Sequence, residues 1–136
     1  MTAGITLAEA DEIIAAAKAY AKSIGVAVAI AVVDTRGDLI AVTRMDESAF
    51  YAVDTARGRE MGAARCADSS KAVADGGLAS HIYQSFGALR GQGRMVIIQG
   101  GVLVKRRGEV VGAVAASGAA PEQDEEAANA GAGALE

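Results

Sequence analysis

The sequence predicts an α+β fold in which an antiparallel β-sheet of about five strands is flanked by helices. Residues 7–24 repeat apolar side chains at helical spacing, residues 26–33 form an unbroken apolar run rich in valine, and two short glycine turns join neighbouring apolar segments. Tight turns join antiparallel strands, and helices must then cover at least one face of the sheet. The chain has 136 residues, so we expect residues 1–136 to form a single domain.

The first helix is expected over residues 7–24. Thr6 and Glu9 have the spacing of a capping box at its start, and Gly25 can end it because glycine tolerates a positive φ. The strand at 26–34 then follows. Since this strand is apolar throughout, we expect both of its faces to be covered.

A hairpin and a second helix are expected next. The turn at residues 35–37 contains a glycine and leads into a return strand at 39–45. Ser48 is a suitable N-cap for a helix that runs to about Cys66. A shorter helical piece is predicted at 69–75, before a pair of glycines.

Three further strands and a closing helix are predicted in the second half of the chain. The strands are expected at 95–99, 102–105 and 109–116, and a glycine turn at 106–108 joins the last two. Pro121 suits the first turn of the closing helix, and the acidic residues after it favour a helix N-terminus.

Composition excludes several classes of function. The net charge is −4 and aromatic residues are 4% of the chain, so neither a basic surface nor base-stacking platforms favour nucleic-acid binding. One cysteine and one histidine exclude an internal disulfide and a zinc cluster within one chain. No leader or membrane-length apolar run is evident, so a cytoplasmic protein without a membrane partner is expected. The many glycines and alanines predict close backbone packing and self-association into a homo-oligomer.

Charged residues at a strand end form the first group of candidate site residues. Arg44 and Asp46 lie where the strand at 39–45 gives way to a loop, a position that often carries a binding site. Asp46, or Asp54 in the helix that follows, could act as a general acid or base if its surroundings tune its pKa. The alternative is that these side chains are simply solvated.

Cations of the second helix and the lone imidazole form the second group. Arg59 and Arg65 could anchor a carboxylate by bidentate contacts, or could be solvated surface residues. His81 is the one histidine and could ligate a haem iron, or could be an ordinary loop residue. Cys66 is interpreted as a small buried hydrophobe rather than a nucleophile.

Several ordered motifs run through nearly the whole chain. They are Val28 to Asp34, Leu39 to Asp46 ending in Arg-Met-Asp, Gly100-Gly101, Gly108 to Ala113, Ser117-Gly118 and Pro121 to Glu125. Together these motifs resemble the GlcG/HbpS-like family. The chain differs from many members in having Leu103 where they have proline after the double glycine, Arg59 in place of lysine, and no histidine in the first helix.

The resemblance implies a fold and a range of functions. Members include haem-binding proteins, glycolate-operon proteins and the C-terminal domain of some corrinoid adenosyltransferases. Their fold is an antiparallel sheet flanked by helices, which agrees with the profilin-like order α-β-β-α-α-β-β-β-α expected here. They usually assemble into homo-oligomers. Some members bind haem and some are described as haem-degrading.

Two functional hypotheses of different classes follow, with a third as a baseline. The first is a haem- or tetrapyrrole-binding protein that could assist haem breakdown, with Arg59 and Arg65 facing the propionates and His81 as the metal ligand. The second is a small enzyme of lyase, isomerase or hydrolase type acting on an oxygenated organic acid, with Asp46 or Asp54 as acid or base and Arg59 holding the carboxylate of the substrate. The third is a scaffold subunit without a ligand. The first two hypotheses both require a cavity near the Arg-Met-Asp strand end and the helix that follows it.

Overall fold

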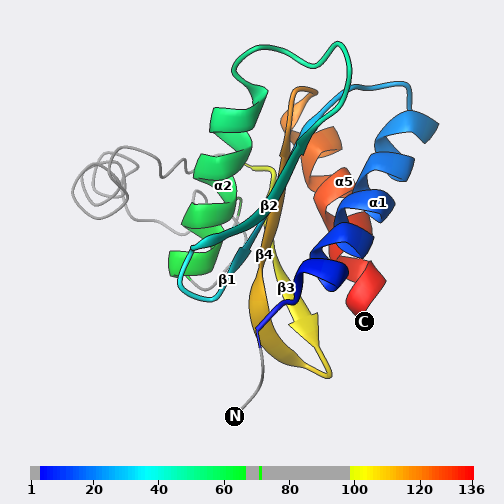
Figure 1. Ribbon diagram of the computed structural model, residues 1–136. Helices are drawn as coiled ribbons and strands as arrows, with labels where there is room; N and C mark the ends of the chain where they lie inside the picture. Colours follow the sequence, from blue (N-terminus) through cyan, green and yellow to red (C-terminus); the bar gives the residue numbers. More distant parts are fainter. Residues whose placement is uncertain (1–3, 67–70, 72–98) are drawn as a thin grey trace.

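The computed structural model describes residues 4–66, 71 and 99–136 and confirms the α+β class (Figure 1). Four strands are described, one fewer than expected, because the predicted strand at 95–99 lies outside the described residues except for Gln99. The predicted helical piece at 69–75 also lies outside them apart from Lys71. The elements are α1 (Leu7–Ser23), β1 (Ala29–Asp34), β2 (Leu39–Arg44), α2 (Ala52–Cys66), β3 (Gly101–Arg106), β4 (Glu109–Ser117), α5 (Pro121–Ala132) and the 3-10 turn η1 (Gly133–Leu135).

The sheet joins two hairpins through its centre. Its strand order is β2-β1-β4-β3, and every neighbouring pair is antiparallel. The β1–β4 pair runs in one register from Ala29 opposite Ser117 to Asp34 opposite Gly112. Strands β1 and β4 are therefore central, which explains why both are apolar almost throughout.

The two hairpin turns use backbone conformations that their sequences allow. Gly37 has a φ of 86° in the β1–β2 turn. Arg107 and Gly108 have φ values of 53° and 80° in the β3–β4 turn, so both of its central residues are left-handed. Such turns match the twist of antiparallel strands, and the predicted hairpins are confirmed.

Helices cover both faces of the sheet, as expected from the apolar first strand. Figure 1 shows α2 on one side of the sheet and α1 with α5 on the other. Side chains of β1 alternate between the two layers because successive residues of a strand point to opposite faces. Those facing α1 and α5 include Ile30 and Val32, and those facing α2 include Ala29 and Ala31.

Helix α1 begins with the predicted capping box. The Glu9 amide donates to Thr6 Oγ1 at 3.1 Å, and the Thr6 amide donates to Glu9 Oε1 at 3.0 Å. Arg106 Nε, at the end of β3, also donates to Glu9 Oε2 at 3.0 Å. The hydrogen bond from the Thr6 amide and the Arg106 guanidinium lower the pKa of the Glu9 carboxyl. One acidic side chain thus caps α1 and ties it to the sheet.

Close backbone packing, predicted from the small residues, is confirmed between α1 and α5. A Cβ on Gly131 would lie 2.9 Å from the Ile13 carbonyl oxygen and 3.2 Å from Ala17 Cβ. A larger side chain at this position would push the two helices apart. None of the described helices is both long and apolar enough to span a bilayer.

The predicted N-cap of the second helix is wrong. The Ser48 hydroxyl donates to the Met45 carbonyl at 2.8 Å, and α2 begins only at Ala52. Glu47, with a φ of 67°, makes a turn between the strand end and the helix. Ser48 therefore stabilises the loop after β2 rather than the first turn of α2.

Candidate functional site

A groove opens between the C-terminal half of α1 and the C-terminal end of β2. Its volume is about 360 Å³, within the range of small-molecule sites. We call it the α1–β2 groove. Its lining residues are Lys18, Lys22, Thr43, Arg44, Met45 and Asp46.

Backbone hydrogen bonds position the end of β2, which forms one wall of this groove. Arg44 is the last residue of β2 and lies opposite Ala29 of β1. Beyond it, the Met45 amide donates to the Val28 carbonyl at 3.0 Å, and the Val28 amide donates to Met45 Sδ at 3.5 Å. The backbone after β2 is therefore held against the start of β1, and Arg44, Met45 and Asp46 stay at the groove.

Cations dominate the α1–β2 groove. Lys18 and Lys22 are four residues apart on α1 and so lie on the same side of the helix. With Arg44 they make three cations, against the single carboxylate of Asp46. Within residues 4–66, 71 and 99–136, no carboxylate forms an ion pair with any of the three. The groove therefore presents a positive field to solvent, which attracts anions.

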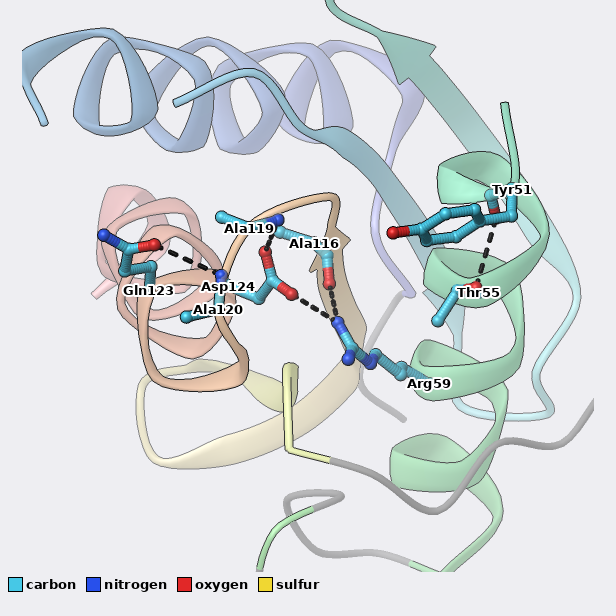
Figure 2. A network of polar contacts seen from close by, with 8 residues as sticks. All are labelled: Tyr51, Thr55, Arg59, Ala116, Ala119, Ala120, Gln123 and Asp124. Atoms are coloured by element: carbon cyan, nitrogen blue, oxygen red, sulfur yellow. Dashed lines mark hydrogen bonds and ion pairs between the residues drawn. The ribbon is translucent and has the colours of Figure 1, made fainter. Parts of the chain in front are cut away.

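Arg59 lies elsewhere, in a buried ion pair that crosses from α2 to α5 (Figure 2). The residue is 5% exposed. Its Nη1 donates to the Ala116 carbonyl at 2.8 Å and to Asp124 Oδ2 at 2.7 Å, and the Ala119 amide donates to Asp124 Oδ1 at 3.0 Å. Arg59 is therefore not a solvated surface residue. Its Nη1 is already engaged within the chain.

Burial governs the electrostatics of this pair. Asp124 is fully buried, and desolvation raises the pKa of its carboxyl. The hydrogen bonds from Arg59 and from the Ala119 amide offset part of that rise in pKa. Arg59 Nε is buried without a hydrogen-bond partner among the residues that the structure describes. The pair thus ties the first turn of α5 to α2, which lies on the other face of the sheet.

The sequence does not reveal Asp124 as the partner of Arg59, although the position of Arg59 carries a signal of burial. Ala52, Ala56 and Ala63 are buried alanines of α2, and Arg59 falls on the same helical stripe. An arginine on an alanine stripe must be buried and therefore paired. Its partner is not evident from the sequence, because the helix dipole already accounts for an acidic residue such as Asp124 in the first turn of a helix.

The structure brings together some of the predicted site residues and separates others. Arg44 and Asp46 share the α1–β2 groove, which also contains two lysines that sequence reasoning did not single out. Asp54 is exposed in the first turn of α2 and does not line the groove. The side chain of Arg65, and the whole of His81, lie outside the described residues.

The cavity expected at the Arg-Met-Asp strand end is present, but α1 forms its other wall, rather than α2. In the described part of the chain, no group of three histidine, cysteine, aspartate or glutamate side chains could hold a metal ion. What the groove can do chemically is hold an anionic ligand beside one carboxylate.

Comparison with known sequences identifies relatives over most of the chain. Residues 5–133 match the family model described as haem degrading protein HbpS-like. A curated relative from Citrobacter freundii, an uncharacterized 15.0 kDa protein of the dhaT-dhaS intergenic region, is 34% identical over 125 residues. That match covers 90% of this chain and 85% of the relative.

Solved structures with the same fold agree with this match. Protein ORFY of Klebsiella pneumoniae is 30% identical with a TM-score of 0.87, covering 99% of this chain and 92% of its own. A double mutant of HbpS from Streptomyces reticuli is 26% identical with a TM-score of 0.83, and the match covers 100% of this chain and 90% of the HbpS chain. A PduOC–haem complex shares the fold at 23% identity, with a TM-score of 0.83 and coverage of 97% and 95%. The chain belongs to the HbpS-like family.

Proposed function

We propose that this protein binds haem or a closely related tetrapyrrole. The observation that carries the proposal is the family match over residues 5–133, since that family is described by its action on haem. HbpS itself has the same fold, and PduOC with this fold has been crystallised with haem. We include in this proposal that the protein assists the breakdown of haem.

The residues of the α1–β2 groove fit such a ligand in their chemistry. Methylene stems of Lys18 and Lys22 and the thioether of Met45 offer apolar surface, while the charged groups can meet propionates. Haem, once bound, supplies the redox chemistry of its iron. The described lining of the groove contains no imidazole. His81 is the one histidine of the sequence, and we propose it as the metal ligand on that ground.

Hemin titration of the purified protein tests the proposal. We expect a saturable, red-shifted Soret band, because a ligated and enclosed porphyrin absorbs differently from free hemin. His81→Ala should alter the position of the band if the imidazole ligates the iron. Asp54→Asn is the matched control, since Asp54 is exposed and outside the groove. Absence of any saturable spectral change with hemin would contradict haem binding.

A second candidate function is supported by the presence of Asp46 and Arg44 in the lining of one groove. In this alternative the protein is a small enzyme that acts on an oxygenated organic acid, with Arg44 holding the substrate carboxylate and Asp46 as acid or base. Arg59, also considered as the anchor, has its Nη1 engaged by Asp124.

Turnover measurements distinguish this enzyme hypothesis. On an identified acid substrate, Asp46→Asn should lower kcat by about 100-fold or more, because general acid–base groups contribute at least that factor. Asp54→Asn should leave kcat unchanged if the groove is the active site. Full turnover in both variants would remove the enzyme hypothesis.

We also propose that the protein is a cytoplasmic homo-oligomer. Phe50 is 90% exposed and Tyr51 is 51% exposed, and their rings pack edge to face with centroids 5.5 Å apart. Leu39 and Val42 are exposed on β2, which is an edge strand of the described sheet. Apolar side chains on an edge strand and a neighbouring loop are typical of surfaces that subunits cover.

A further inference from the structure

We propose that the α1–β2 groove recognises the carboxylates of its ligand through Lys18, Lys22 and Arg44. The protein would then select tetrapyrroles with ionised propionate side chains. This inference rests on the proposed haem binding and goes beyond it, because it names the ligand feature that is recognised and the residues that recognise it.

The arrangement of the three cations is unfavourable without a ligand. Lys18 and Lys22 are one helical turn apart, where like charges destabilise a helix. Arg44 adds a third positive charge from the opposite wall. An anion bound between these walls would relieve the repulsion among all three cations.

Two arginines elsewhere in the described part of the chain are neutralised internally. Arg59 pairs with Asp124 at 2.7 Å, and Arg106 pairs with Glu9. Lys18, Lys22 and Arg44 have no such partner among the described residues. Lys18 is partly buried and Lys22 is exposed. The three charged groups remain available to an external anion.

The charge of the groove matches a ligand with two carboxylates. Three cations and the carboxylate of Asp46 leave two positive charges in excess. A tetrapyrrole with two ionised propionates carries two negative charges at these positions. Arg44 can form a bidentate pair with one carboxylate, and the two ammonium groups can meet the other. The carboxylate of Asp46 lowers the affinity of the groove for anions.

Titration of the full-length protein with hemin and with hemin dimethyl ester tests the inference. Esterification removes both propionate charges and keeps the macrocycle and the iron. We expect wild type to bind hemin about tenfold or more tightly than the ester, a factor that corresponds to about 1.4 kcal/mol. The preference should weaken as the salt concentration rises.

Variants of the lining assign the effect to the groove. The triple change Lys18→Gln, Lys22→Gln and Arg44→Gln should weaken hemin binding about tenfold and leave binding of the ester unchanged. Asp46→Asn should tighten hemin binding, because it removes the one repulsive charge. Asp54→Asn should change neither affinity.

The outcomes separate this inference from the proposed function. Binding of hemin and its ester with equal affinity, unchanged in the triple variant and in Asp46→Asn, would overturn carboxylate recognition and leave haem binding intact. Failure to bind either compound would overturn both. A stronger preference for hemin in Asp46→Asn and its loss in the triple variant would support the inference, since a general loss of folding cannot produce opposite changes.

Discussion

Replacement of Arg59 by methionine should lower the free energy of unfolding by about 3–5 kcal/mol, because it leaves the Asp124 carboxylate buried without its cation. The side chains of Arg59 and Asp124 are only 6% and 1% exposed, so water cannot replace the lost partner. Methionine keeps most of the apolar volume of the arginine stem, so the change isolates the charge. Urea unfolding monitored by circular dichroism measures the effect.

A double-mutant cycle supplies the control for this prediction. Asp124→Leu alone should also destabilise the protein, because Arg59 would then be the unpaired charge. The double variant Arg59→Met, Asp124→Leu should recover much of the stability, since neither charge is left buried. If the double variant loses as much stability as the two single variants lose together, the result would contradict a direct ion pair.

The loss of stability caused by Arg59→Met should also depend on pH. Burial raises the pKa of Asp124 and Arg59 partly offsets this rise, so removal of Arg59 raises the pKa further. A folded-state pKa above the unfolded value means that the native state binds the proton more tightly. Stability is then retained below the unfolded pKa of about 4 and is lost as the pH rises through the folded pKa. We therefore expect the deficit relative to wild type to be smallest in acid and largest at neutral pH.

Replacement of Gly112 by alanine is the other change with a large expected effect. The added Cβ would lie 2.1 Å from the Val33 carbonyl oxygen and 2.6 Å from Ile5 Cδ1. Gly112 faces Asp34 in the central β1–β4 pair, so the clash would push apart the strands that join the two hairpins. We expect destabilisation by about 3 kcal/mol, at the upper end of typical overpacking costs. The shift of the midpoint in urea unfolding measures it.

Gly133→Ala is the matched control for Gly112→Ala. No atom lies within 4 Å of a Cβ added at Gly133, and its backbone is helical with φ −63° and ψ −17°. Its stability should stay within about 0.5 kcal/mol of wild type. Equal urea midpoints for the two alanine variants would contradict the predicted clash of a Cβ at Gly112.

Local signals were sufficient for most of the fold. Thr6 and Glu9 identified the start of α1 because a capping box involves residues three apart. The β3–β4 hairpin was predicted from a turn with Gly108, which readily takes a positive φ. Ser48 shows the limit of such signals, since the same hydroxyl can cap a helix or bond to the loop before it.

The candidate site depended on contacts between distant parts of the chain. Arg59 and Asp124 are 65 residues apart, and no local pattern associates them. Sequence reasoning found Arg44 and Asp46 because they end a strand, but it took the following helix as the other wall of the cavity. Only the packing of α1 beside β2 brought Lys18 and Lys22 to the same groove.

The sequence by itself therefore determined the elements, the two hairpins and the family of this protein. Hydrogen-bonded turns, caps and the alternation of apolar residues act over a few positions, so they can be recognised along the chain. The tertiary structure alone decided which cations are paired inside the protein and which line the α1–β2 groove. Whether a charge such as that of Arg59 is neutralised depends on burial and on partners from other elements, and these are set when the layers pack together.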